Sequence, residues 1–182
     1  GRKAHIVVDL TYGDAGKGTI TDWLARTRPV RTVIRFNGGA QAGHNVVTPE
    51  GVHNTFSQFG SATFVPGVRT HLSRFMILNP LSMLVEERRL ASLGVTDAFK
   101  RTTISAEALI ITPFQRAANR LREISRGKGR HGSCGMGIGE TAMDAQVVGG
   151  TVVRAGDLLR RDDLKRKLRW LQSYKRGQMR DT

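Results

Sequence analysis

Short apolar runs and longer amphipathic segments alternate along the chain, with glycine-rich stretches between them. The apolar runs predict strands at residues 4–10, 30–36, 75–78 and 102–105, and a short hairpin over residues 46–56. The segments with helical spacing predict helices at residues 18–26, 80–92 and 113–124. Strands that alternate with helices are typical of an α/β fold, so we expect a mostly parallel sheet flanked by helices, in one domain over residues 1–182.

The stretch between the first predicted strand and helix carries the first candidate chemistry. It reads Tyr-Gly-Asp-Ala-Gly-Lys-Gly-Thr, residues 12–19. A glycine-rich turn before a helix aims backbone N–H groups and the positive end of the helix dipole at one point, which favours a phosphate. Lys17 adds a positive charge there and Thr19 a hydroxyl. Asp14 would be repelled by a phosphate unless a divalent metal lies between them or the carboxylate takes part in proton transfer.

This turn is not a standard P-loop. That motif has a glycine five residues before its Gly-Lys pair and a Ser or Thr directly after the lysine. Those positions hold Thr11 and Gly18 here. The turn also lacks the third glycine of a dinucleotide fingerprint. A second interpretation therefore stays open, in which the turn only links a strand to a helix.

A second glycine-rich loop, residues 37–44, follows the predicted strand at 30–36. Ligands bind at the carboxyl ends of the strands in an open parallel sheet, so we expect this loop to lie near residues 13–19. Asp14, Lys17 and His44 would then surround one phosphate, which suits acid–base work and stabilisation of developing charge. The alternative is that His44 is an ordinary surface histidine.

A third glycine-rich stretch covers residues 132–141. Its unhindered N–H groups and the hydroxyls of Ser133 and Thr141 are suited to a second anion site. The alternative is a surface loop without a ligand.

The composition narrows the class of protein. Hydrophobic content is 39% and charged content 24%, as in ordinary globular domains. No apolar run approaches the roughly 18 residues that span a bilayer, and no signal peptide is recognisable. The single cysteine, Cys134, excludes an internal disulfide and fits a reducing, cytoplasmic location. The net charge of +14 indicates anionic partners, such as nucleotides, nucleic acid or acidic proteins.

Half of that excess charge lies in residues 154–180, which contain ten Lys or Arg and three Asp. Leu164, Leu168 and Leu171 recur there at helical spacing. We therefore expect a basic amphipathic helix, whose outer face is either simply solvated or a contact surface for nucleic acid.

The three glycine loops share their order and spacing with one known family. The matching stretches are residues 13–18 (GDAGKG), 35–44 (RFNGGAQAGH) and 135–139 (GMGIG), and residues 78–80, 112–114 and 154–158 agree as well. In these motifs the chain resembles the adenylosuccinate synthetase family, over essentially its whole length.

The resemblance implies an activity and roles for individual residues. Members of the family join L-aspartate to IMP with GTP and Mg²⁺, through a 6-phosphoryl intermediate. By resemblance, Asp14 is the base that removes the purine N1 proton and also a magnesium ligand. The carbonyl of Gly43 is a second magnesium ligand, and His44 is the acid that assists phosphoryl transfer. Removing the proton makes the purine oxygen nucleophilic, while the metal and His44 relieve charge on the transferring phosphate.

The resemblance also implies binding positions. Those for GTP and its phosphates are Gly13, Gly16, Lys17, Gly18, Thr19, Gly43, His44 and Asn45. Those for IMP or a related purine monophosphate are Asp14, Lys17, Gln41, Ala42, Gly43, His44, Ser133 and Cys134. A homodimer is implied as well.

Several positions depart from the usual pattern of the family. They are Ala15, Ala40, Gln41, Ser133, Cys134, Met136, Glu140 and the surroundings of Val148. Because they gather on the side of the nucleotide substrate, they bear on the identity of the acceptor more than on the type of reaction.

Members of the family are more than twice as long as these 182 residues. Their guanine-recognising and aspartate-binding motifs have no counterpart here. We therefore expect the N-terminal part of a longer synthetase, which does not complete the ligase reaction alone. The alternative is a truncated, non-catalytic module that binds a nucleotide or nucleic acid.

Overall fold

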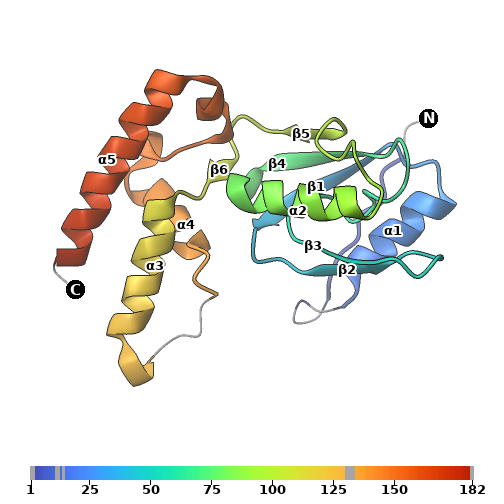
Figure 1. The fold of residues 1–182 in the computed structure, drawn as a ribbon, viewed down its shortest axis with the longest axis horizontal. Helices are drawn as coiled ribbons and strands as arrows, with labels where there is room; N and C mark the ends of the chain where they lie inside the picture. The colour runs from blue at the N-terminus through green and yellow to red at the C-terminus, as the bar shows by residue number, and fades with distance from the viewer. Residues whose placement is uncertain (1–2, 11–12, 14, 130–133, 181–182) are drawn as a thin grey trace.

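The computed structural model describes residues 3–10, 13, 15–129 and 134–180 (Figure 1). Its strands are β1 (Thr32–Gly39), β2 (His44–Val47), β3 (His53–Phe56), β4 (Arg69–Leu78), β5 (Thr102–Ile104) and β6 (Leu109–Ile110). Its α-helices are α1 (Lys17–Thr27), α2 (Pro80–Ser92), α3 (Pro113–Ser125), α4 (Ile138–Val147) and α5 (Arg161–Arg180). Three short 3-10 helices are η1 (Gly127–Gly129), η2 (Gly149–Thr151) and η3 (Ala155–Leu159).

Strand β4 is the centre of a parallel sheet. β1 pairs with it in parallel from Thr32 to Gly39, and β5 and β6 pair with it in parallel at its beginning and its end. The antiparallel hairpin β2–β3 forms a separate two-stranded sheet. The predicted α/β class with a parallel sheet and flanking helices is therefore confirmed.

The core lies on one face of this sheet. Alternate residues of β4, namely Leu72, Met76 and Leu78, are fully buried. Phe56 at the end of the hairpin and Leu90 of α2 complete the same cluster. Figure 1 shows α2 lying over the sheet, while α3, α4 and α5 lie together beyond the end of the sheet that carries β6.

Helices α2 and α3 begin where the sequence predicts, because both have strong starting signals. Asn79 caps α2 by accepting a hydrogen bond from the Ser82 amide at 3.1 Å, and Pro80 follows in the first turn. Thr112 and Gln115 form a capping box at the start of α3.

The strand predicted at residues 4–10, ahead of the phosphate turn, is wrong. Residues 3–10 have no regular secondary structure, and the side chains of Ile6 and Leu10 are 85% and 91% exposed. An apolar run forms a strand only when a neighbouring strand supplies hydrogen bonds. Within the described residues, β1 pairs with β4 and with no other strand, so this run has no ladder to join.

Strand β6, helix α4 and the three 3-10 helices were not predicted. Strand β6 is only two residues long, and α4 begins inside the third glycine-rich stretch, residues 132–141, for which the sequence predicts an anion site or a surface loop. The N-cap residue of α4 is Gly137, whose φ of 82° is accessible to glycine but strained for other residues.

Helix α5 covers most of the basic segment, residues 154–180. Its Leu171 is fully buried, and Leu164 and Leu168 pack against the same core cluster. In the described part of the chain, no helix is long and apolar enough to cross a membrane.

Candidate functional site

The start of α1 and the start of β2 lie against each other, which brings the first two glycine loops together. A Cβ atom added to Gly18 would lie 2.8 Å from the Cβ of His44, so only glycine allows this approach. The Thr19 hydroxyl donates a hydrogen bond to the Asn45 carbonyl at 3.1 Å. The structure thus places Lys17, Gly18 and Thr19 beside His44 and Asn45, as the sequence predicts.

The Lys17 ammonium is held at the edge of this junction. Its Nζ lies 2.5 Å from a carboxylate oxygen of Asp9 and donates to the Gly13 carbonyl at 3.0 Å. These contacts fold the lysine back over the glycine turn. Sequence reasoning missed Asp9, although a carboxylate inside an apolar run is a visible signal of a polar role.

His44 is half-buried and lies next to Arg35 of β1. Arg35 Nη2 lies 3.3 Å from His44 Nε2. Because a guanidinium can only donate, His44 Nε2 is the acceptor, and the proton of a neutral His44 sits on Nδ1. Burial lowers the pKa of His44 below its usual 6.5, and the positive charges of Arg35 and Lys17 lower it further. His44 is therefore neutral at pH 7 in this structure.

Arg35 is the first residue of the second matching stretch, residues 35–44, and the sequence predicts no role for it. It is partly buried, and its Nη1 donates to the Ser57 carbonyl, so the guanidinium is anchored between β1 and the residues that follow β3. An arginine inside an otherwise apolar strand is the signal that would have singled it out.

Gly39, the last residue of β1, links the second and third loops. A Cβ atom there would lie 2.8 Å from Gln41 Oε1 and 2.9 Å from Ile138 Cδ1, at the first residue of α4. A Cβ at Gly137 would lie 2.9 Å from the backbone nitrogen of Arg116. The end of the third loop is therefore packed between the end of β1 and the start of α3, at the carboxyl edge of the sheet.

Some predicted site residues are not placed by the structure. Asp14 and Ser133 lie outside the described residues. Cys134 is an exposed free thiol, Gly43 is exposed and Ala42 is half-buried.

The described residues contain no group of three or more His, Cys, Asp or Glu side chains that could hold a metal ion. A magnesium ion in a nucleotide site takes most of its ligands from phosphate oxygens and water, with one or two oxygens from the protein. Gly43, beside His44, is exposed, and Asp14, the other expected ligand, lies outside the described residues.

Glu140, a departure from the family pattern, joins a buried charge cluster between α4 and α5. Lys175 Nζ lies 2.8 Å from Glu140 Oε2 and 2.6 Å from Asp144 Oδ1. Arg122 of α3 pairs with the other Glu140 oxygen at 2.9 Å. This cluster fixes α4, and with it the end of the third loop, on α3 and α5.

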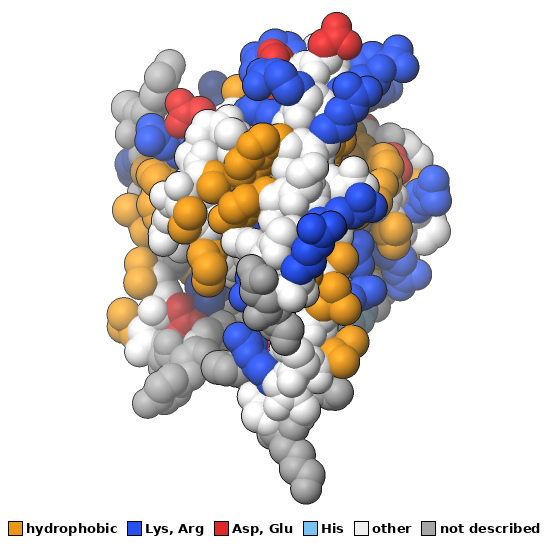
Figure 2. All heavy atoms as spheres, turned by 90° about the vertical axis from the view of Figure 1, so that its left-hand side faces the viewer, with side chains coloured by type: hydrophobic (Ala, Val, Ile, Leu, Met, Phe, Trp, Pro, Cys, Tyr) orange, Lys and Arg blue, Asp and Glu red, His pale blue; other side chains and the backbone are white. Residues whose placement is uncertain are grey.

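The basic segment, residues 154–180, is not a continuous surface of free cations. Lys167 and Arg160 both pair with the buried Asp157, and Arg166 pairs with Asp163. Figure 2 shows the side of the molecule on the left of Figure 1, where Lys and Arg side chains are mixed with hydrophobic ones and a few acidic ones. Part of the charge thus stabilises the fold itself.

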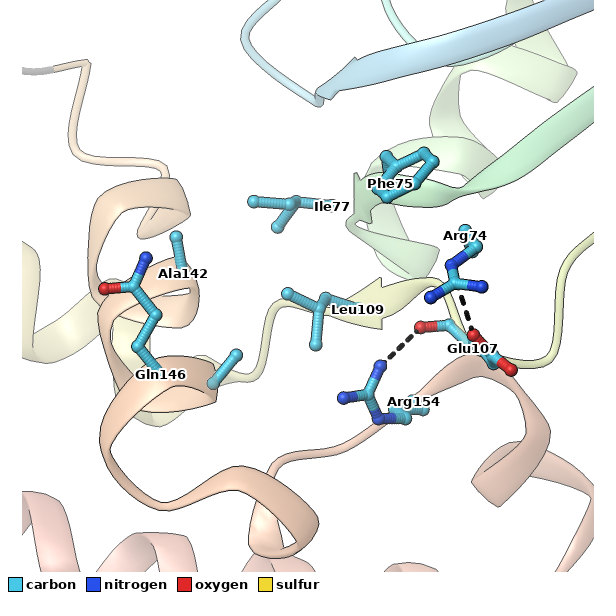
Figure 3. A pocket seen from close by; sticks show the side chains of 9 residues that line it. Arg74, Phe75, Ile77, Glu107, Leu109, Ala142, Gln146 and Arg154 are labelled. Atoms are coloured by element: carbon cyan, nitrogen blue, oxygen red, sulfur yellow. Dashed lines mark hydrogen bonds and ion pairs between the residues drawn. The ribbon is translucent and has the colours of Figure 1, made fainter.

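One open cleft of about 600 Å³ lies between the end of the sheet and α4 (Figure 3). Ile77 and Leu109 are among the residues that line it. At its rim Glu107 accepts from Arg154 Nη1 through its carbonyl at 2.8 Å and pairs with Arg74 through its carboxylate at 3.4 Å. None of the predicted site residues lines this cleft.

Comparison with known proteins decides the family. The sequence profile of the adenylosuccinate synthetase family matches residues 6–182. The chain belongs to this family. Adenylosuccinate synthetase of Neisseria gonorrhoeae is 34% identical over 172 residues, which are 94% of this chain and 39% of that protein. The enzyme of Gloeothece citriformis is 35% identical over 170 residues, 93% of this chain and 36% of that protein. The chain therefore spans less than two-fifths of the length of these curated relatives.

Solved structures agree on the fold. The fully ligated adenylosuccinate synthetase of Plasmodium falciparum superposes with a TM-score of 0.80 at 22% identity, over 94% of this chain and 39% of that one. The succinoaminodeoxyadenylate synthetase of cyanophage S-2L, bound to dGMP and dATP, superposes with a TM-score of 0.64 at 19% identity, over 84% of this chain and 41% of that one. The family match and the curated relatives do not favour the alternative of a truncated, non-catalytic module that binds a nucleotide or nucleic acid.

Proposed function

We propose that this chain is the phosphate-binding and acid–base part of a synthetase that joins L-aspartate to a purine monophosphate at the expense of GTP. The observation that carries the proposal is the junction of the two glycine loops, where Gly18 touches His44 and Thr19 bonds to Asn45. Membership of the adenylosuccinate synthetase family supports it.

The first loop supplies the phosphate site. Gly13, Gly16 and Gly18 leave the N–H groups at the start of α1 unobstructed, and no acidic residue lies in the first turn of that helix. A phosphate there gains from the helix dipole and from the Lys17 ammonium. On binding, Lys17 exchanges its contact with Asp9 for one with a phosphate oxygen.

His44 supplies a hydrogen-bond donor to the transferring phosphate. With Nε2 accepting from Arg35, Nδ1–H is the group available for donation. The negative charge of a bound nucleotide opposes the effects of Arg35 and Lys17, so it raises the pKa of His44 toward the working pH. His44 then stabilises charge on the phosphoryl group and moves a proton to it.

Asp14 is proposed as the base that takes the purine N1 proton. Asp14 comes two residues before Gly16 and three before Lys17 in the sequence, and this nearness along the chain supports the proposal. Asp14 and the Gly43 carbonyl would hold Mg²⁺, which neutralises charge on the nucleotide phosphates when it is bound.

The acceptor nucleotide is proposed to contact Gln41, Ala42, Ser133 and Cys134. Gln41 lies two residues beyond the end of β1, and its side chain lies near Gly39 and the packed start of α4, where the second and third loops approach each other. Because Gln41, Ser133 and Cys134 depart from the usual pattern of the family, the purine that the protein accepts has to be determined by experiment. IMP and dGMP, the nucleotide held by the cyanophage relative, are the two acceptors to compare.

We further propose that the protein works in the cytoplasm as a homodimer. The single cysteine is compatible with a reducing compartment.

Nucleotide binding tests the first part of the proposal. Isothermal titration of this chain with GTP and Mg²⁺ should show saturable binding that Lys17→Ala weakens by about tenfold, the equivalent of one charge-assisted contact. Lys165→Ala, on an exposed part of α5, is the matched control and should bind like the wild type. Equal affinities for all three proteins would contradict the proposed phosphate site.

Turnover tests the second part. In the protein that carries this chain, GTP- and aspartate-dependent conversion of IMP or dGMP should be abolished by Asp14→Asn, while circular dichroism shows an intact fold. Wild-type turnover by that variant would remove Asp14 from the mechanism.

A further inference from the structure

A second open cleft, of about 530 Å³, lies between the hairpin, α2 and the start of α3. It contains none of the residues predicted to bind GTP, purine nucleotide or magnesium. Two arginines line it, Arg89 from α2 and Arg116 from α3, together with Asn54 of β3. Leu81 and Val85, both largely exposed, form an apolar wall on the α2 side.

Two buried donors in this cleft have no acceptor. Asn54 is only 5% exposed, and its Nδ2 has no hydrogen-bond partner among the described residues. The Nε of Arg116 is also buried and without a partner there. A buried donor that bonds to nothing is destabilising, so two residues with such donors that line one cleft call for an explanation.

The acidic residue of the cleft does not satisfy them. Both carboxylate oxygens of Glu86 are occupied by backbone amides, with Ser57 and Gln58 at 2.9 Å and Phe59 at 3.3 Å. No ion pair joins Arg89 or Arg116 to a carboxylate in the described part of the chain. The cleft therefore presents donors and positive charge, and its negative charge is directed toward the backbone.

The cleft of Figure 3 has the opposite character. There Arg74 and Arg154 are both engaged by Glu107, so their donors are already used in part. Buried donors without a hydrogen-bond partner also occur elsewhere in the described chain, at Asn79 Nδ2 and Arg101 Nε, but these residues line neither cleft, whereas Asn54 and Arg116 both line the cleft between α2 and α3.

We propose that the cleft between α2 and α3 binds a small oxyanion, the phosphate or carboxylate group of a metabolite. The Arg116 guanidinium is suited to a two-point contact with such a group, while Asn54 Nδ2 donates a further bond and Arg89 adds charge from the rim. Leu81 and Val85 contact the apolar part of the molecule that carries the anion. This site is additional to the phosphate site at Lys17 and does not depend on it.

NMR signals of the unpartnered N–H groups test whether an anion binds in the cleft. A ¹⁵N-labelled chain is titrated with sodium phosphate, and in a second arm with sodium acetate, against sodium chloride at equal ionic strength. We expect saturable shifts of the Asn54 side-chain amide and the Arg116 Nε–Hε resonances. The arm that saturates at the lower concentration identifies the anion as phosphate or carboxylate. Absence of saturation in both arms overturns the proposal.

Variants separate this site from general charge effects. Arg89→Gln and Arg116→Gln should each weaken binding by about tenfold, the loss of one contact to a charged group. Arg88→Gln is the matched control, because Arg88 is an exposed neighbour on α2 that does not line the cleft; it should stay within about twofold of the wild type. Equal weakening by Arg88→Gln overturns the proposal. Because Arg89 is exposed, its substitution keeps the test valid even if Arg116→Gln does not fold.

Lys17→Ala distinguishes this site from the proposed GTP site. The shifts at Asn54 should persist in that variant, whether or not GTP binding is lost. Loss of the Asn54 shifts in Lys17→Ala would show that the anion acts through the first glycine loop and would overturn the proposal.

Discussion

Lys175→Met tests how the buried charge cluster holds the third glycine loop in place. Lys175 is 4% exposed, and its Nζ donates to Glu140, Asp144 and Gln178 at 2.6–3.0 Å. Methionine keeps the volume of the side chain but removes the charge and all three donors. Two carboxylates that are each less than one-tenth exposed then lose their shared cation.

The size of the effect follows from what remains. Breaking a buried ion pair from one side typically costs about 3–5 kcal/mol. Glu140 keeps Arg122 at 2.9 Å, and Asp144 keeps a bond from Gln115 Nε2 at 3.0 Å, so we expect the lower limit, about 3 kcal/mol. With a urea m value of about 2–3 kcal/mol/M, the unfolding midpoint should fall by about 1–1.5 M.

Urea unfolding followed by far-UV circular dichroism measures the loss. Lys165→Met is the control, since Lys165 is exposed on the same helix, and its free energy of unfolding should change by less than about 0.5 kcal/mol. Adding Asp144→Asn to Lys175→Met removes one orphaned charge and should recover part of the loss. Equal midpoints for Lys175→Met and Lys165→Met would refute the role of the cluster.

Two further predictions concern the junction of the first two loops. Gly18→Ala puts a methyl group 2.8 Å from His44 Cβ and should lower the free energy of unfolding by about 1–3 kcal/mol. Gly177→Ala in α5, where a Cβ meets nothing within 4 Å, should raise it by about 0.5–1 kcal/mol. Chemical denaturation that ranks the two variants in reverse would contradict the packing described. The lowered pKa of His44 means that below pH 6.5 the unfolded chain takes up a proton that the folded chain does not, so stability is complete above that pH and declines as the pH falls toward the folded pKa. Denaturation at pH 7.5 and pH 5.5 should show a smaller decline for His44→Gln than for the wild type, and identical declines would count against a shifted His44.

The nearness of the first two glycine loops was expected from the sequence, while the roles proposed for their residues stay predictions. Glycine is required where the backbone turns tightly or where another chain segment approaches closely. The glycines at 13, 16 and 18 can therefore be recognised in the sequence as a tight turn. The structure gives Gly18 a definite reason, its contact with His44. The helix starts at Pro80 and Pro113 were equally local, since each follows its own capping residue.

The elements that sequence reasoning got wrong depend on distant partners. Residues 4–10 have the pattern of a strand, but a strand needs a neighbour, and in the described chain none pairs with them. Helix α4 was hidden in a glycine-rich stretch because its stability comes from Lys175 and Arg122, which bind its carboxylates from two other helices.

The sequence by itself determined the α/β class, the family and the two glycine loops, because periodicity, capping and glycine placement are properties of neighbouring residues. Only the tertiary structure decided that Arg35 donates a hydrogen bond to His44, that Asp9 pairs with Lys17, and that two residues with unpartnered donors line the cleft between α2 and α3. Burial and charge at a given atom depend on which distant segments pack around it, and no pattern along the chain specifies that arrangement.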